Sequence, residues 1–191
     1  LAILIFQVLD KQRIKSIILI LIVIPGIFFA AYQGSSLFKV RVDMAFHEVA
    51  TFKDQKDTSV GLRINMAINS WQIIKKNPVF GVGTGDFPTE YAKVNQVNSP
   101  GLPNVSNPHN MYSLVTSQLG LIGLISLLSI FYYQLKFAYK SSSSKFIRNV
   151  GATLPLLFLV MMLSDSYLLG HYTTLMYVFF SSFLYQDFEK N

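Results

Sequence analysis

Long apolar runs recur along this chain and constrain its fold more than any other feature. A helix needs about 20 mainly apolar residues to cross the ~30 Å hydrocarbon layer of a bilayer. The runs that approach this length are residues 14–32, 111–135, 146–163 and 167–185. With 51% hydrophobic and only 14% charged residues, the composition is also typical of membrane proteins. Because backbone polar groups in lipid must be satisfied within each segment, the sequence predicts an all-α, polytopic transmembrane protein.

The two ends of the chain carry separate expectations. Residues 1–9 are apolar but too short to span, and basic residues follow this stretch instead of preceding it, which argues against a signal peptide. We expect residues 1–9 to be the end of a truncated transmembrane span, so that the chain is the C-terminal part of a larger polytopic protein. Residues 186–191 are expected to form a cytoplasmic tail.

The distribution of basic residues predicts the orientation of the spans. Basic clusters flank the first and second complete runs: Lys11, Arg13 and Lys15, then Lys136, Lys140, Lys145 and Arg148. Short basic loops face the cytoplasm, so residues 33–110 are predicted to form a large extracytoplasmic loop between two spans. Since acidic residues are interleaved with the basic ones of that loop, the net charge of +6 does not indicate a nucleic-acid partner.

The expected outer loop contains one clear helical pattern, at about residues 58–77. Its apolar stripe has helical spacing and ends at a proline: Leu62, Met66 and Ile73, then Pro78. Trp71 on this amphipathic helix is typical of a helix that lies against lipid head groups. For residues 39–56, a short extended stretch and an interfacial helix remain alternatives. Residues 88–108, with several prolines, are expected to form a loop.

His109 lies where the polar loop meets the apolar run that begins at Met111. Asn107 is a suitable N-cap and Pro108 a suitable first helical residue, so His109 is expected in the first turn of a helix that enters the membrane. The positive end of the helix dipole disfavours a second positive charge, which predicts a neutral imidazole able to accept a proton from a hydroxyl. The alternative is an interfacial histidine that only hydrogen-bonds a neighbour.

Two arginines of the outer loop are candidate anion ligands. Arg63 lies on the predicted helix near the membrane surface, where its planar guanidinium can form a bidentate clamp on a phosphate. Its side chain can equally extend to lipid phosphates, which is the more common role of such an arginine. Arg41, which follows the first complete span, is a weaker candidate.

The glycine-rich run Gly81-x-Gly83-x-Gly85 has two interpretations. Its spacing matches neither a Walker loop nor a dinucleotide fingerprint, so a tight turn with positive φ angles is favoured. A backbone site for phosphate is the alternative.

The sequence gives no indication of a metal centre. The chain has no cysteine, which excludes thiolate catalysis and Cys-based metal sites. His47 stands beside Glu48, but no further ligand follows at a suitable spacing, so this pair is not predicted to bind a metal.

Several of these residues follow one another in a recognisable order. The order is Arg63, Trp71, residues 77–87 (NPVFGVGTGDF), residues 108–110 (PHN) and residues 119–123 (LGLIG). It resembles the O-antigen ligase and polysaccharide polymerase superfamily of bacterial membrane glycosyltransferases. In that superfamily a periplasmic loop carries an arginine ahead of a tryptophan, a Pro-x-x-Gly-x-Gly turn, and a His-Asn pair at the start of the next span. The resemblance is close over residues 63–128, with one departure, because Gln118 stands where the family often has glutamate.

The resemblance implies an enzyme of the bacterial inner membrane that moves glycan from an undecaprenyl-pyrophosphate carrier to an acceptor hydroxyl. The expected partners are this lipid-linked donor, a glycan or lipid acceptor, and membrane lipids. Neither a metal nor another cofactor is expected. His109 would act as the catalytic base. A substrate-binding role is expected for Arg63, Arg41, Gly81, Gly83 and Asn110.

Other functional classes remain as alternatives. A transporter or flippase is expected to carry polar residues and internal repeats in its spans, whereas these spans hold few polar residues, mainly Gln118 and His171. A membrane-anchored sensor is expected to have a cytoplasmic output domain, and the cytoplasmic segments here are short. Within the enzyme class, ligase, polymerase and protein O-oligosaccharyltransferase differ in their acceptors. Polymerase is favoured only because such enzymes are numerous and varied in sequence.

Overall fold

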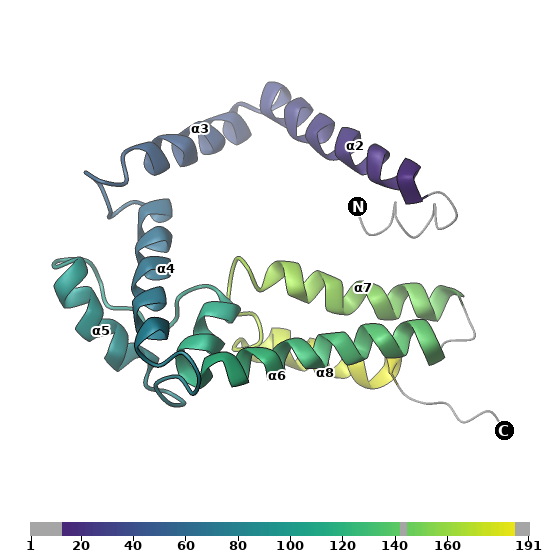
Figure 1. The fold of residues 1–191 in the computed structure, drawn as a ribbon. Helices are drawn as coiled ribbons and strands as arrows, with labels where there is room; N and C mark the ends of the chain where they lie inside the picture. Colours follow the sequence, from purple (N-terminus) through teal and green to yellow (C-terminus); the bar gives the residue numbers. More distant parts are fainter. Residues whose placement is uncertain (1–12, 142–144, 186–191) are drawn as a thin grey trace. The chain divides into compact units, whose positions relative to one another are not determined.

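The computed structural model describes residues 13–141 and 145–185, and within these ranges all regular secondary structure is helical (Figure 1). The helices are α2 (Arg13–Gly34), α3 (Ser36–Ala50), α4 (Ser59–Lys76), α5 (Phe87–Asn98), α6 (Met111–Ser141), α7 (Lys145–Met161) and α8 (His171–Leu184). The prediction of an all-α chain is therefore confirmed over the described residues. The predictions for residues 1–9 and 186–191 lie outside them.

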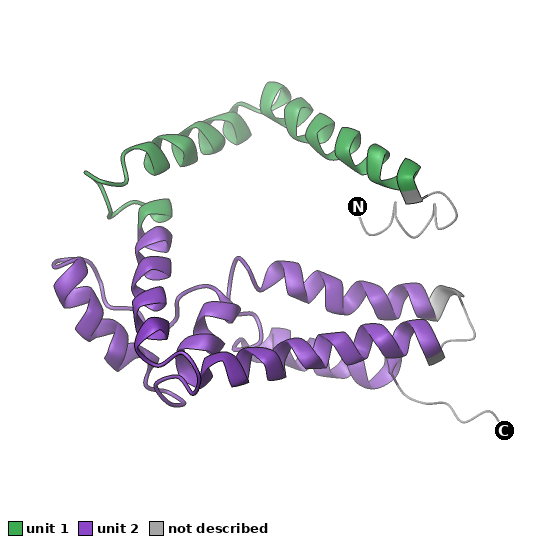
Figure 2. Ribbon diagram, in the orientation of Figure 1, with its two compact units in different colours: residues 1–61 green, residues 62–191 purple. Residues whose placement is uncertain are grey.

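The chain divides into two compact units, residues 1–61 and 62–191 (Figure 2). Among the described residues, each unit contains one helix that is long and apolar enough to cross a membrane, namely Ile14–Gly34 in the first and Met111–Lys140 in the second. A shorter apolar helix, Arg148–Met161, follows in the second unit.

In the first unit, α2 packs against α3 through specific side-chain contacts. The Tyr32 hydroxyl donates a hydrogen bond of 2.7 Å to the Asp43 carboxylate. The Ser35 hydroxyl accepts a hydrogen bond from the backbone N–H of Phe38 and thereby caps α3. Of the two alternatives for residues 39–56, the structure has the helix over its first part, because this cap fixes the start of α3.

In the second unit, α4, α5 and the start of α6 share a core that contains both apolar and polar side chains. Its buried apolar side chains are Met66, Ile73, Phe87, Tyr91, Val94 and Leu114.

Helix α5 contradicts the expectation of a loop over residues 88–108. Pro88 stands in the first turn of α5, where the missing N–H of proline has no helical partner to lose.

Helices α6, α7 and α8 form the other part of this unit, with α7 packed against both α6 and α8 (Figure 1). Their buried core is Leu127, Phe131, Phe158, Met162 and Tyr177. The expected span over residues 167–185 differs from the structure, in which α8 begins only at His171 and has 14 residues. The preceding turn is held by hydrogen bonds such as that from the Thr174 hydroxyl to the Leu168 carbonyl. Fourteen helical residues rise only ~21 Å, which is shorter than the ~30 Å hydrocarbon layer of a bilayer.

Helix α6 is not the continuous span expected over residues 111–135. Gly120 has φ 64° and ψ −161°, so the helix breaks there and a second helical segment follows. The turn after α4 packs into this break, because Val82 N–H donates to the Ser117 carbonyl and Leu121 N–H donates to the Pro78 carbonyl, each over 2.9 Å. A Cβ atom on Gly120 would lie 2.1 Å from the Val79 carbonyl oxygen. The two glycine-containing segments therefore fit together only without side chains at the contact.

Candidate functional site

His109 precedes α6, and this corrects the expectation that it lies in the first turn. Asn110, not Asn107, caps the helix, because its side-chain oxygen accepts a 2.9 Å hydrogen bond from Ser113 N–H. Both asparagines are good caps by residue type, and the structure uses the later one. His109 has φ 50°, a left-handed conformation that no other described non-glycine residue adopts. The Asn107 side chain stabilises this conformation by accepting a 3.0 Å hydrogen bond from His109 N–H.

The imidazole of His109 contacts a carboxylate that the sequence did not single out. His109 Nδ1 lies 3.0 Å from Asp165 Oδ1, in the turn between α7 and α8. The same carboxylate oxygen accepts a 2.7 Å hydrogen bond from Ser166 N–H, and the Ser166 hydroxyl donates to Asn107 over 2.7 Å. These contacts tie the backbone N–H and the Nδ1 atom of His109 into one network. It fixes the ring so that Nδ1 faces Asp165.

The geometry has a direct chemical consequence for His109. When Nδ1–H donates to a carboxylate, Nε2 is the nitrogen left with a lone pair that can accept a proton. The side chains of His109 and Asp165 are 44% and 42% exposed, so an incoming group can reach the imidazole. The expected base therefore has an orienting partner. The signal in the sequence that could have singled out Asp165 is its position in the short polar turn Ser164–Ser166, between the apolar runs 146–163 and 167–185.

The turn that carries Asp165 is fastened to the start of α6. The Asn110 side-chain nitrogen donates to the Leu163 carbonyl over 2.9 Å, and Met111 N–H donates to the Met162 carbonyl over 3.0 Å. Asn110 thus holds the helix start and the neighbouring turn together. Its side-chain nitrogen donates to the Leu163 carbonyl and its side-chain oxygen accepts from Ser113 N–H, which gives it a structural role beside the histidine.

Arg63 and His109 line one cavity of about 180 Å³. The other residues around it are Ala67, Pro108, Asn110, Ser113, Leu163 and Ser164. Arg63 comes from α4, whereas His109 comes from the segment before α6, so segments well separated in sequence meet here. Within the described part of the chain, the Arg63 guanidinium makes no hydrogen bond or ion pair, and the side chain is exposed. Its N–H donors are therefore free to bind an anion.

The other predicted binding residues have different surroundings. Gly81 N–H donates to the Asn77 carbonyl and Gly83 N–H to the Gln118 carbonyl, each over 3.0 Å. These two amides are thus engaged within the protein. Both glycines have positive φ angles, as the tight-turn interpretation requires. Arg41 lies on α3 in the first unit, with an exposed side chain.

Gln118, the departure from the family pattern, takes part in the same turn. Its backbone carbonyl accepts the hydrogen bond from Gly83 N–H. A Cβ atom on Gly81 would lie 2.3 Å from the carbonyl carbon of Gln118, so the backbones of these two residues are in direct contact. This contact uses main-chain atoms and does not depend on the charge of the side chain at position 118.

Comparison with protein families shows to which family the chain belongs. Residues 1–128 match the family model described as O-antigen ligase. The chain belongs to the O-antigen ligase family. The match includes Arg63, the glycine turn and His109, so the resemblance found in the sequence is confirmed. It ends before Asp165, which means that the carboxylate facing His109 lies outside the matched region. No curated protein matched the chain.

Members of the O-antigen ligase family are bacterial inner-membrane proteins of a ligase and polymerase type that handles glycans. The long apolar helices of this chain are consistent with that location.

Proposed function

We propose that this protein is a membrane glycosyltransferase that moves glycan from undecaprenyl pyrophosphate to an acceptor hydroxyl. The observation that carries the proposal is the cavity lined by both Arg63 and His109. A cation and a base are the two groups that such a transfer needs, one for the leaving phosphate and one for the attacking hydroxyl. The proposed reaction forms a bond from the acceptor oxygen to the anomeric carbon and breaks the bond from that carbon to the phosphate oxygen.

Arg63 serves the donor in this scheme. As the glycosyl–phosphate bond breaks, negative charge grows on the departing pyrophosphate. A guanidinium with free N–H donors stabilises that charge by paired, charge-assisted hydrogen bonds. Arg41 is the second proposed ligand for the carrier phosphates, because it is an exposed cation in the segment that follows the first apolar helix.

His109 serves the acceptor. Its Nε2 takes the proton of the attacking hydroxyl, and the imidazolium that forms is stabilised by Asp165 across the 3.0 Å contact at Nδ1. Asp165 is thus a positioning residue, because it acts through the histidine and not on the substrate. Asn107 and Ser166 fix the positions of the histidine and the carboxylate relative to each other.

The membrane arrangement belongs to the same proposal. Residues 33–110 lie on the extracytoplasmic side, between the apolar helices Ile14–Gly34 and Met111–Lys140. The basic clusters on the cytoplasmic ends of these helices support this orientation. His109 then stands at the outer membrane–water boundary, at the depth where a carrier anchored by its lipid chain presents its pyrophosphate.

The proposal is tested by transfer from a defined donor in proteoliposomes. The full-length protein is supplied with an undecaprenyl-pyrophosphate-linked oligosaccharide and, in parallel assays, a glycan, a lipid-linked glycan or a peptide acceptor. We expect product with one acceptor class, which also separates polymerase, ligase and protein O-oligosaccharyltransferase. His109→Ala should remove this activity, and His171→Ala is the matched control, since His171 lies outside the cavity.

The same assay separates the enzyme from its alternatives. A flippase moves the intact lipid-linked glycan across the bilayer and releases no carrier, and a sensor does neither. Transmembrane movement without release of undecaprenyl pyrophosphate would therefore overturn the proposal.

A further inference from the structure

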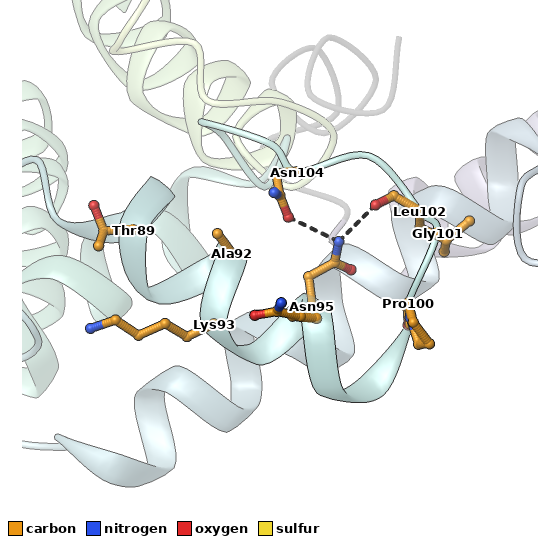
Figure 3. Close-up of a pocket in the computed structure, with 10 residues that line it drawn as sticks. Thr89, Ala92, Lys93, Asn95, Pro100, Gly101, Leu102 and Asn104 are labelled. Carbon is orange, nitrogen blue, oxygen red and sulfur yellow. Dashed lines mark hydrogen bonds between the residues drawn. The ribbon is translucent and has the colours of Figure 1, made fainter.

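A second and larger pocket lies between α5 and the loop that follows it (Figure 3). Its volume is about 520 Å³, which is within the roughly 300–1,000 Å³ typical of sites for small ligands. The lining residues come from α5 and residues 99–104, and none of them lines the cavity of Arg63 and His109. The two pockets are therefore separate sites of the second unit.

Asn95 gives this pocket a fixed shape. Its side chain is buried, with 2% of the residue exposed. The amide nitrogen donates to the Leu102 carbonyl over 2.9 Å and to the Asn104 side chain over 3.1 Å, and so ties the loop to the helix (Figure 3). The amide oxygen accepts hydrogen bonds from Asn65 and Asn69 on α4. Because the wall is already ordered, a ligand would bind without the cost of organising it.

The groups that remain available in the pocket are neutral and polar. The Thr89 hydroxyl and the Gln96 amide are exposed and have no hydrogen-bond partner among the residues that the structure describes. The amide nitrogen of Asn104 is likewise unengaged there, since only its oxygen receives the bond from Asn95. Hydroxyl and amide groups both donate and accept hydrogen bonds. This combination matches the hydroxyl groups of a sugar, which also do both.

The charge of the pocket argues for an uncharged ligand. Lys93 is its only charged lining residue, and Glu90 on the preceding turn of α5 forms an ion pair with it. The wall therefore offers no unpaired cation comparable to Arg63. Ala92 and Pro100 supply apolar surface for the C–H groups of a ligand.

We propose that this pocket binds an uncharged sugar unit of the glycan, at a position away from the bond that is made or broken. The inference rests on the proposed function, because glycan handling is what makes a sugar the expected ligand. Binding here would hold the glycan chain while its reacting end occupies the cavity of Arg63 and His109. Loss of this contact therefore weakens glycan binding and shortens the product, while His109 remains competent in the chemical step.

Binding of a defined probe to the purified full-length protein tests the proposal. The probe is the neutral oligosaccharide fraction released by mild acid from the polymer of wild-type cells, with inorganic phosphate as the charged comparison. Ala92→Trp places a bulky indole in the pocket and should weaken oligosaccharide binding about tenfold or more. Thr89→Val removes one hydroxyl with little change in volume and should weaken it about threefold, as for one neutral hydrogen bond. Val97→Ala, at an exposed position of α5 outside the pocket, is the matched control.

The results separate this inference from the proposed function. If His109→Ala abolishes transfer but retains oligosaccharide binding, and Ala92→Trp loses binding, both proposals stand. Equal binding by wild type, Ala92→Trp and Thr89→Val, or no binding by wild type, would overturn the sugar site whatever the transfer assay shows. Transfer that survives in His109→Ala would overturn the catalytic assignment and leave the binding result to be judged by itself.

Discussion

The two pockets of the second unit differ in charge and in the use they make of their polar groups. The cavity of about 180 Å³ has a free guanidinium, Arg63, and an imidazole, His109, held by Asp165. The pocket of about 520 Å³ has amides and a hydroxyl, and its one lysine is paired with Glu90. The first arrangement suits charge that develops and protons that move. The second suits a neutral ligand that is held without chemical change.

The contrast shows that the buried asparagines of this unit order its structure, whereas the exposed Arg63 and His109 are available to bind a ligand. Asn65, Asn69 and Asn95 are buried and hydrogen-bonded to one another and to neighbouring groups of α5 and residues 99–104, so they order the surrounding backbone. Arg63 and His109 remain accessible and line one cavity. Substitutions in the two pockets should therefore affect different measured quantities.

The largest effect is expected from Gly120→Ala, which should destabilise the second unit. The glycine has a backbone conformation closed to other residues, and a Cβ atom would lie 2.1 Å from the Val79 carbonyl oxygen. We expect a loss of about 3 kcal/mol or more in the free energy of unfolding. Gly85→Ala is the control, because Gly85 also has a positive φ but no atom within 4 Å of the added carbon. A thermal unfolding midpoint equal to that of wild type would contradict the described contact.

Asp165→Asn should have the next largest effect. It should affect only the cavity of Arg63 and His109. The amide cannot stabilise the imidazolium as the carboxylate does, so kcat should fall roughly a hundredfold with little change in KM. In the His109→Ala background, the same substitution should cause no further loss. An additive loss in the double variant would show that Asp165 acts independently of the histidine. Oligosaccharide binding serves as the internal control and should remain unchanged.

Arg63→Lys sharpens the contrast between charge and geometry. A lysine keeps the positive charge but loses the planar pair of donors that fits a phosphate. We expect KM for the lipid-linked donor to rise roughly tenfold, a loss of the size of one charge-assisted hydrogen bond. Steady-state assays at varied donor concentration measure it. An unchanged KM would indicate that Arg63 contributes only a general positive field.

The smallest effect is expected from Gln96→Ala in the neutral pocket. One amide is removed from an exposed position, so oligosaccharide affinity should fall only a few-fold. Single-turnover transfer to a short acceptor should keep its wild-type rate. A decrease in that rate would mean that the two pockets do not divide the work as proposed.

The sequence identified Arg63 and His109 because residue type and position at a membrane boundary are local properties. Asp165 could not be paired with His109 in this way, since the two are 56 residues apart and meet only when α6 packs beside α7. The reasoning about local structure near His109 was also wrong in detail. Either Asn107 or Asn110 could have capped the helix, and only the tertiary contacts to the Leu163 carbonyl select Asn110.

Glycines and prolines explain the remaining differences in the fold. Gly120 was counted within a continuous apolar run, because hydropathy does not show that the Val79–Phe80 backbone needs its space. Pro88 favours a loop by residue type, but a proline is equally suited to begin a helix, as it does in α5. The positive φ angles of Gly81 and Gly83 were favoured correctly from residue type, whereas the partners of their amides depended on the break in α6.

The most direct test of the central claim measures polymer and lipid-linked intermediates in cells that depend on the full-length protein. Wild type, His109→Ala, Arg63→Ala and the control His171→Ala are compared at matched membrane levels. The account predicts that His109→Ala and Arg63→Ala lose the glycan product and accumulate glycan on undecaprenyl pyrophosphate, while His171→Ala behaves as wild type. Normal product with no accumulation in His109→Ala would contradict it and leave this histidine as a hydrogen-bonded residue of the membrane interface.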